Sequence, residues 1–327
     1  MQILNVKAKA QERLAGQESA VRRVATIHAG VIAAAALLVS AIQFIVQQKI
    51  NTVVGLSGMG MLSMLETVQS VLQTVMNILQ PFWVMGFLCV ALRIARGQQV
   101  SAGNLLEGFR RFGPVLRLMI LKVLIFGGLA VACIYVTSMI YTITPFSQKM
   151  VDIMFPLMES GATMEEMSQA LYQLPVEEMM DIAVPVMVIF SVIYGVIAAV
   201  MFYRMRLADL VIMDKPGTRA RAALAISGRL SRKKRWQLFR VDLSFWWYYA
   251  LQVLALLVCW ADMLLPLVGI NLPVDESVLY FGCYAAGLAL QVLLFRKWGG
   301  YINATWAVTC DTLTEELVQQ MPKQETT

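Results

Sequence analysis

The chain is built from long apolar stretches separated by shorter polar segments. Six stretches contain no Lys, Arg, Asp or Glu, and they lie at residues 24–48, 67–92, 123–148, 182–203, 243–261 and 277–295. A helix that crosses the hydrocarbon core of a bilayer needs about 20 predominantly apolar residues. None of the stretches shows the two-residue alternation of a membrane-barrel strand. The pattern therefore predicts an all-α, polytopic integral membrane bundle of about six transmembrane helices with amphipathic interfacial helices.

The start of the second span is the least certain boundary in this pattern. Residues 51–64 are also uncharged, but they contain three glycines and precede Glu66. We expect an outer loop that enters the second helix near Leu65, and a re-entrant segment at 53–65 is the alternative. Pro81 lies within this helix and should kink it, because proline removes one backbone donor.

Basic residues lie almost entirely on one side of the predicted bundle. Segments 1–23, 93–122, 204–242 and 296–327 hold 5, 6, 11 and 3 of the 27 Lys and Arg residues. Cytoplasmic loops of membrane proteins carry an excess of Lys and Arg. We therefore expect a multi-pass cell-membrane protein with both termini in the cytoplasm.

The same division predicts the domain organisation. Residues 1–23 form a basic cytoplasmic segment, 24–297 a six-helix membrane domain, and 298–327 a cytoplasmic C-terminal tail. The composition agrees, because 58% of the residues are hydrophobic and only 15% are charged. Soluble domains carry about 25% charged residues, and disordered chains have few bulky apolar ones, so both classes are excluded.

An outer acidic loop is predicted at 149–181, where seven acidic residues stand against one lysine. Thr163 and Glu166 match a helix capping box. We expect two short amphipathic helices, broken near Gly161 and Pro175. Methionines recur here at helical spacing and offer soft ligands for copper(I), although filling an apolar face is the commoner role of methionine.

Residues able to carry catalysis are scarce. His28 is the only histidine, which excludes a zinc site built on histidines. The five cysteines have no CxxC spacing, and no phosphate-binding loop or dinucleotide fingerprint occurs. We expect no catalytic residues, no metal and no cofactor, and hence a protein that is not an enzyme.

Polar side chains inside the apolar stretches are candidates for a polar path or for bonds between helices. Charged groups within spans are costly and draw attention to function, and Asp262 lies near the outer end of the fifth stretch. Hydrogen bonding between helices is the commoner role of an amide in a span. The possible polar path comprises Gln252, Asp262 and Gln291, and Gln43, Asn77 and Gln80 are further amides of this kind.

A basic hairpin at 204–242 holds 11 of the 27 basic residues. Ala220, Ala223, Leu224 and Ser227 share one helical face, with arginines away from it. This pattern is typical of an interfacial helix whose apolar face meets acyl chains and whose cations meet phosphate. The residues expected to bind anionic lipid are Arg219, Arg221, Arg229, Arg232, Lys233, Lys234, Arg235, Trp236 and Arg240. Nucleic acid is not an expected partner, because the membrane lies beside the hairpin.

Several short motifs are distributed along the chain. They are Lys7-Ala8-Lys9-Ala10 with Leu14-Ala15-Gly16, Asp214-x-Pro216, Ala223-Leu224-x-x-Ser227-x-x-Leu230, Trp236-x-Leu238-Phe239-x-x-x-Leu243-Ser244-Phe245-x-Trp247, and Gly300-Tyr301-x-x-Ala304-Thr305-x-Ala307. Together they resemble the signature of bacterial multi-pass membrane proteins grouped as domain of unknown function 975. The resemblance implies a bacterial polytopic helical protein and supplies no established activity.

One departure from that signature lies in the hairpin. The family usually places Met-Lys-Gly where this chain has Ser231-Arg232-Lys233. Without the glycine, we expect a more continuous basic helix in place of a tight turn.

Three functions are consistent with these patterns. The first is a non-enzymatic membrane scaffold or accessory subunit that binds anionic lipid through the basic hairpin and contacts a membrane-protein partner. The alternative is a transporter or export-system component that uses the polar path. A membrane-embedded enzyme is a lesser alternative, because no acid–base cluster accompanies the spans.

Overall fold

The structure, a computed structural model, describes residues 3–52, 56–144, 147–163, 166, 176–215, 217–267, 269–270 and 275–320. Every regular element among these residues is helical, and none of them forms a strand. The helices are α1 (Ile3–Ala15), α2 (Glu18–Thr52), α3 (Leu56–Ala95), the 3₁₀-helix η1 (Ala102–Leu106), α4 (Glu107–Arg110), α5 (Phe112–Thr142), α6 (Ser147–Glu159), α8 (Val176–Met205), α9 (Ala208–Asp214), α10 (Ala220–Leu230), α11 (Arg235–Leu243), α12 (Trp246–Cys259), α13 (Ala261–Leu267), α14 (Glu276–Leu294), the π-helix η2 (Phe295–Gly299) and α15 (Gly300–Gln320). The predicted all-α class is confirmed.

Long apolar helices dominate the chain. Within the described residues, five are long and apolar enough to cross a membrane: Glu18–Val46, Thr67–Ala95, Phe112–Thr142, Ala183–Asp214 and Ser277–Gln319. A sixth crossing results if α11 and α12, which are bent by 59° relative to each other, count as one span. The predicted number of about six spans is therefore confirmed.

The predicted fifth span, 243–261, is interrupted on both sides. Helix α12 has only 14 residues, which at 1.5 Å per residue is about 21 Å, less than the hydrocarbon core of about 30 Å. It is preceded by the bend after α11 and followed by a break at Trp260, where α13 begins. The predicted fifth span is therefore not one continuous helix over 243–261.

The second span begins earlier than predicted. Helix α3 starts at Leu56, so the expected loop before Leu65 is helical from that point onward. Leu and Met are strong helix formers, and together they outweigh the cost of about 1 kcal/mol for each of Gly58 and Gly60. The helix assignment continues through Pro81 to Ala95. Residues 53–55, which belong to the re-entrant alternative, lie outside the described residues.

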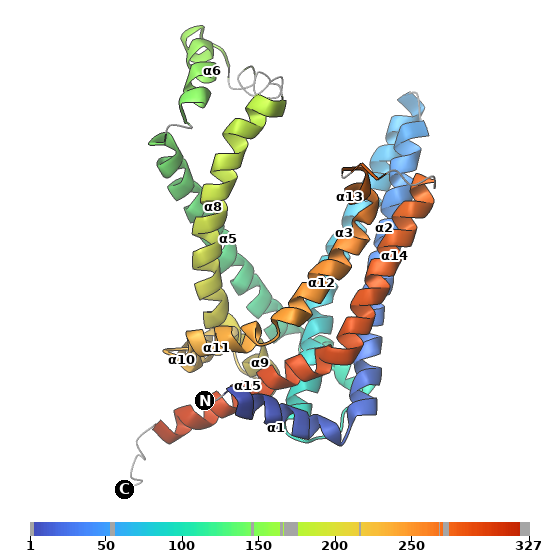
Figure 1. Cartoon of the computed structure of the whole chain (residues 1–327), viewed down its shortest axis with the longest axis vertical. Coiled ribbons are helices and arrows are strands. Elements are labelled where there is room, and N and C mark those ends of the chain that lie inside the picture. Colours follow the sequence, from blue (N-terminus) through green and yellow to red (C-terminus); the bar gives the residue numbers. More distant parts are fainter. Residues whose placement is uncertain are drawn as a thin grey trace. The chain divides into compact units, whose positions relative to one another are not determined.

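The chain divides into two compact units, Met1–Arg117 with Arg206–Thr327, and Leu118–Met205. In the first unit, α2, α3, α12 and α14 lie side by side, with α14 contacting both α2 and α12 (Figure 1). The shorter helices α1, η1, α4, α9, α10 and α11 gather with α15 at one end of these four (Figure 1). We call this group of short helices with α15 the platform.

Two glycines allow the platform to approach α3 closely. A Cβ atom at Gly86 would overlap the carbonyl of Leu105, and one at Gly108 would overlap the carbonyl of Phe82. Because neither glycine has a side chain, η1 and α4 lie against the backbone of α3. This contact is the tightest between the platform and a long helix among the glycine positions described, and only glycine permits it.

Helix α15 contributes more buried residues to the platform than any of its other described helices. Its buried residues include Ala304, Trp306 and Ala307, and it contacts α1, α3 and α10. The π-turn η2 connects it to α14 without a break in the helical chain. Residues 300–320 of the predicted tail therefore form a helix that packs into the protein.

The second unit contains the rest of α5, with α6 and α8. The first predicted outer helix is confirmed as α6, which ends at Glu159 before Gly161 at a positive φ of 76°. The predicted capping box is also present, since the backbone N–H of Thr163 donates to Glu166 Oε2 at 2.7 Å. Residues 167–175, where the second helix and Pro175 were expected, lie outside the described residues.

Candidate functional site

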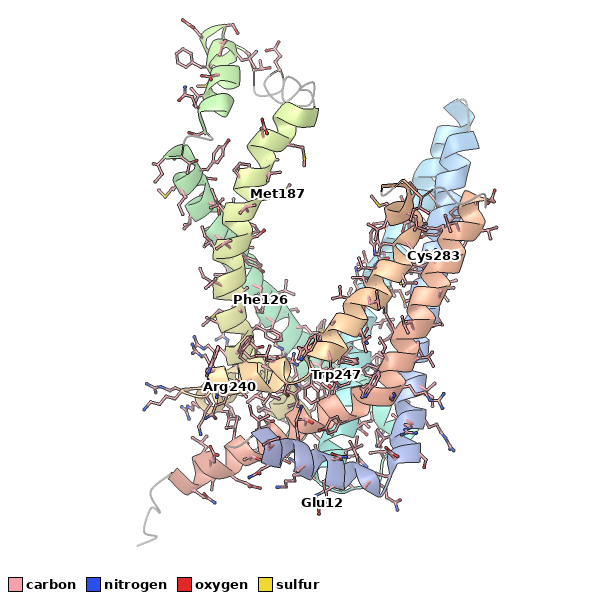
Figure 2. The ribbon with its side chains drawn as sticks, viewed as in Figure 1. Glu12, Phe126, Met187, Arg240, Trp247 and Cys283 are labelled. Atoms are coloured by element: carbon pink, nitrogen blue, oxygen red, sulfur yellow. The ribbon has the colours of Figure 1, made fainter. Side chains whose placement is uncertain are left out.

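The basic hairpin presents its cations to the surroundings. Seven of the nine predicted lipid-binding residues are exposed arginines or lysines that form no salt bridge among the described residues: Arg219, Arg221, Arg229, Arg232, Lys233, Arg235 and Arg240. Trp236 is 63% exposed and stacks on Phe239 at 5.1 Å between ring centroids. The Arg240 guanidinium lies 5.7 Å from the centre of the Trp236 ring, and Figure 2 shows long basic side chains extending outward near Arg240.

Lys234 differs from the other cations of the hairpin. Its ammonium group donates to Glu316 Oε2 on α15 at 3.0 Å, and both side chains are about three-quarters buried. Lys234 therefore ties the hairpin to α15, whereas its basic neighbours remain available to a ligand.

The small-residue face of α10 is buried inside the protein. Ala223 and Ser227 are fully buried, Ala220 and Leu230 nearly so, and α10 contacts α9 and α15. The interpretation that this face meets acyl chains is therefore wrong. Small side chains on one face suit close helix packing as well as they suit a lipid interface, and the neighbouring helices cover this face.

The turn between α10 and α11 also differs from the prediction. The helix ends at Leu230, residues 231–234 form a turn, and α11 begins at Arg235. Lys233 has φ = 64°, and it is the one non-glycine residue with positive φ among those described. The expected continuous helix is wrong, because the chain turns at residues 231–234 and places a left-handed residue at Lys233. Such a conformation costs a non-glycine residue roughly 1–2 kcal/mol.

A charged cluster joins α3, α9 and α15. The Arg96 guanidinium donates to Asp214 Oδ1 at 2.5 Å and to Asp311 Oδ1 at 3.0 Å. These hydrogen bonds raise the pKa of Arg96 above its ordinary value, so Arg96 carries its charge at any working pH. Arg111 donates to the carbonyls of Ile212 and Met213 in the last turn of α9. A cation there complements the partial negative charge of the helix C-terminus.

A second polar cluster surrounds Asp242 on α11. Its Oδ1 accepts a hydrogen bond from Trp306 Nε1 at 3.2 Å and from the Tyr249 hydroxyl at 2.9 Å. Arg206 lies over the Trp306 ring at 4.6 Å and 3.6 Å from the carboxylate. Nearby, Lys7 of α1 donates to the carbonyl of Ser244 at 3.1 Å. Three helices of the platform, α1, α11 and α15, therefore meet at these groups with α12 and with the segment before α9.

The comparisons with known proteins define the family of this chain. A family model described as "Protein of unknown function (DUF975)" matches residues 1–308. The chain belongs to the DUF975 family. No curated protein matches the chain, and neither does any solved structure.

The DUF975 signature residues lie mainly inside the platform. Leu238, Phe245, Ala304 and Ala307 are buried, and Lys7 lies 4.0 Å from the centre of the Phe245 ring. The signature thus describes how the platform packs. The contacts made by Arg96, Asp242 and Trp306 could not be predicted from the sequence. Each of these residues lies 64 to 215 residues away from the group it contacts. The one available signal was the presence of acidic residues inside a strongly basic hairpin.

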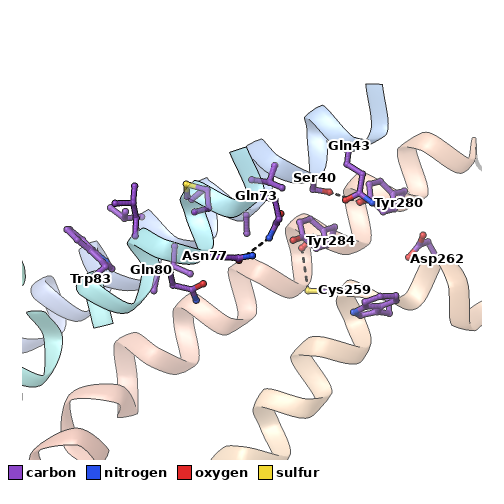
Figure 3. A pocket seen from close by; sticks show the side chains of 18 of the residues that line it. Ser40, Gln43, Gln73, Asn77, Gln80, Trp83, Cys259, Asp262, Tyr280 and Tyr284 are labelled. Carbon is purple, nitrogen blue, oxygen red and sulfur yellow. Dashed lines mark hydrogen bonds between the residues drawn. The ribbon is translucent and has the colours of Figure 1, made fainter. Parts of the chain in front are cut away.

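A pocket lies among the long helices of the first unit in this DUF975 protein. It has a volume of about 1010 Å³ and is lined by α2, α3, α4 with η1, α12, α13 and α14. Figure 3 shows its polar side chains, with Ser40 and Tyr280 at one end and Trp83 at the other. The Ser40 Oγ and Tyr280 hydroxyl are hydrogen-bonded at 2.5 Å, and Gln73 donates to Asn77 at 3.1 Å.

The predicted polar-path residues do not converge on this pocket. Asp262 lines it, together with Gln43, Asn77 and Gln80. Gln252 instead donates to the Tyr248 hydroxyl at 2.9 Å on its own helix, and Gln291 approaches Cys259 Sγ at 3.9 Å. The pocket therefore combines one predicted path residue with amides that were expected to bond between helices.

His28 packs among aromatic rings. It is buried between Trp83, Phe87 and Phe295, with the nearest ring centroid, that of Phe87, at 4.7 Å. No group of three or more His, Cys, Asp or Glu side chains that could hold a metal occurs among the described residues.

Proposed function

We propose that this protein is a non-enzymatic scaffold or accessory subunit of the cell membrane that binds anionic lipid through its basic hairpin. The observation that carries the proposal is the set of seven exposed, unbridged Arg and Lys side chains on and between α10 and α11, beside the exposed Trp236. These cations belong to the same compact unit as three long apolar helices. A cationic surface next to membrane spans lies where lipid phosphates are concentrated.

The energetics favour this role over simple solvation of the charges. Each basic residue near an anionic leaflet contributes about 1 kcal/mol to binding, so several of them together retain acidic lipid against exchange. Trp236 adds an amphipathic ring of the kind that is enriched at membrane–water interfaces. The burial of the apolar face of α10 refines the mode of contact, because the hairpin then meets headgroups through charge and through Trp236.

Retention of lipid by the purified protein tests the proposal. The variant R229Q/R232Q/K233Q/R235Q removes four exposed charges and keeps Lys234, which pairs with Glu316. After purification from mixed phosphatidylglycerol–phosphatidylcholine membranes, native mass spectrometry should show at least tenfold less bound phosphatidylglycerol on the variant than on the parent protein.

The matched control removes the same charge elsewhere. K9Q/R23Q/R117Q/R296Q also neutralises four exposed basic residues, all outside the hairpin. It should retain phosphatidylglycerol nearly as the parent protein does. An equal loss of bound phosphatidylglycerol in both variants would show that net charge alone retains the lipid, which contradicts a site in the hairpin. Unchanged lipid in the hairpin variant would also refute the proposal.

Membrane sidedness is part of the proposal. The lysine and arginine distribution supports a cytoplasmic hairpin and cytoplasmic termini, with residues 149–181 on the outer side. Reporter fusions at residues 160 and 225 should indicate the outside and the inside, respectively. Identical signals at the two positions would overturn this topology.

The pocket favours a carrier as the second candidate. A volume of about 1010 Å³ lined by spanning helices and by Asp262 is large enough for a small solute. Reconstituted vesicles that show a proton or cation flux, lost in D262N but present in E12Q, would support the carrier. An absence of flux in vesicles that still bind anionic lipid would favour the scaffold.

A further inference from the structure

The pocket lined by α2, α3 and α12–α14 carries an uncompensated negative charge. Asp262 is the one charged side chain among the described residues that line it, and no lysine, arginine or histidine is among them. No described residue forms a hydrogen bond or ion pair with the Asp262 carboxylate. An anion would be repelled from this pocket, whereas a cation would find a partner.

The pocket is also polarised along its length. One end gathers Ser40, Gln43 and Tyr280 with Asp262, and the other end is walled by Trp83 and Phe109, as Figure 3 shows for the labelled residues. The amides of Gln73, Asn77 and Gln80 on α3 line the pocket between these ends, among mainly apolar side chains. On α2 the lining runs from Val31 to Gln43, which spans about 18 Å at 1.5 Å per residue. A ligand that fills the pocket therefore needs a polar head and an extended, mainly apolar body.

Aromatic groups near Asp262 strengthen the preference for a cationic head. Tyr280 and Tyr284 are stacked with 6.1 Å between their ring centroids, and both line the pocket beside Trp260. Ring faces attract cations, and more strongly where water is partly excluded. The Asp262 carboxylate and the Tyr284 ring thus line the same pocket, where both favour a cation.

We propose that this pocket binds an amphiphile whose head is a protonated amine and whose body is an alkyl chain. The ammonium group pairs with Asp262 and lies near Tyr280 and Tyr284. The alkyl chain extends toward Trp83 and Phe109. The inference concerns a different surface from the basic hairpin, which would repel such a ligand, and it holds whether or not the ligand is transported.

A spin-label measurement tests the proposal on the full chain in phosphatidylcholine nanodiscs. The probe is a nitroxide-labelled octadecylamine, and the comparison probe is the methyl ester of the matching labelled octadecanoic acid, which is uncharged. The amine should show a motionally restricted component with about tenfold higher affinity than the ester, since a charge-assisted hydrogen bond to Asp262 stabilises only the amine. Equal restriction of the two probes would overturn the proposal.

Variants locate the binding. D262N should remove the preference for the amine, and E12Q, which removes an exposed acid from α1, should keep it. A35W fills the apolar part of the pocket without touching Asp262 and should weaken binding of the amine at least fivefold, which also covers the case in which D262N fails to fold. A preference that persists in both D262N and A35W would place the amine elsewhere and refute the proposal.

Competition identifies the source of the amine. If unlabelled phosphatidylethanolamine displaces the probe, the ligand is a membrane lipid with an amine headgroup. If only single-chain amines displace it, the ligand is a free amphiphile. Displacement by phosphatidylglycerol at the same concentration would contradict the charge selectivity and overturn the proposal.

Discussion

Asp242 accepts a hydrogen bond from the indole nitrogen of Trp306 at 3.2 Å, across 64 residues of chain. The contact joins α11 of the basic hairpin to α15, and the same carboxylate oxygen accepts from Tyr249 at the start of α12. Arg206 completes the cluster from the segment before α9. Two of the exposed cations of the hairpin, Arg235 and Arg240, therefore lie on a helix that a partly buried acid holds against α15.

Removal of this acid should destabilise the platform. D242A leaves the Trp306 and Tyr249 donors without this acceptor and removes the carboxylate 3.6 Å from Arg206, which should cost about 2–4 kcal/mol. Thermal unfolding in detergent, followed by tryptophan fluorescence, measures the loss. The control E12A changes an exposed acid on α1 and should leave the midpoint unchanged. An unchanged midpoint in D242A would show that the cluster does not stabilise the fold.

Replacement of Lys233 by glycine should stabilise the protein. Lys233 occupies a left-handed conformation with φ = 64°, which glycine adopts without steric strain. We expect K233G to gain about 1 kcal/mol in the free energy of unfolding. A225G, in the middle of α10, should lose about 1 kcal/mol because glycine is a poor residue in a helix interior. Denaturant titrations compare the two, and a loss in both variants would contradict the assigned turn.

Alanine at Gly86 should disrupt the contact between α3 and η1. The added Cβ would overlap the Leu105 carbonyl, which belongs to the backbone and has little freedom to move aside. We expect a loss of about 3 kcal/mol. Gly30 in α2 is the matched control, since nothing lies within 4 Å of its added Cβ. G30A should be neutral or slightly stabilising, and equal effects of G86A and G30A in thermal unfolding would exclude the close approach.

The start of α14 should loosen at acid pH. The Ser277 side chain and the backbone N–H groups of Ser277 and Val278 bond to Asp275, and they hold the pKa of its carboxyl below the ordinary value. Because the folded pKa is lowered, the cap's contribution is fully present above the unfolded pKa of about 4 and is lost as pH falls through the folded pKa. Hydrogen exchange at Ser277 and Val278, corrected for intrinsic rates, should accelerate there. D275N caps without ionising and should remove this pH dependence.

The long helices could be predicted because their cause is local. An apolar run of about 20 residues needs a helix wherever lipid surrounds it, so the stretches at 24–48 and 182–203 already contain the information. Local sequence was insufficient at 243–261, where composition alone could not show that the chain bends before Trp246 and again at Trp260. Helix α12 packs closely on α14, where Gly287 lies against Cys259, and a contact of this kind cannot be inferred from composition.

The candidate sites divide in the same way. The exposed cations of the hairpin could be predicted from the sequence, because clustered charges remain exposed unless acidic residues pair with them. Most of these cations do remain exposed. The sequence could not show which cation forms an ion pair, since Lys234 pairs with Glu316 on a helix 82 residues away. The pocket could not be predicted from the sequence either. Asp262, Gln43 and Asn77 belong to three different helices, and no periodicity in the sequence shows that these helices are adjacent.

The sequence by itself determined the helical class, the approximate number of spans, the asymmetry of positive charge and the family. These properties depend on composition and on spacing within single segments. The tertiary structure alone decided which face of α10 is buried, that Lys233 adopts a left-handed turn, and that Asp262 is the one charged side chain among the described residues that line the pocket. Each of these depends on contacts between residues far apart in the chain, and the free energy of such contacts arises only when the helices pack.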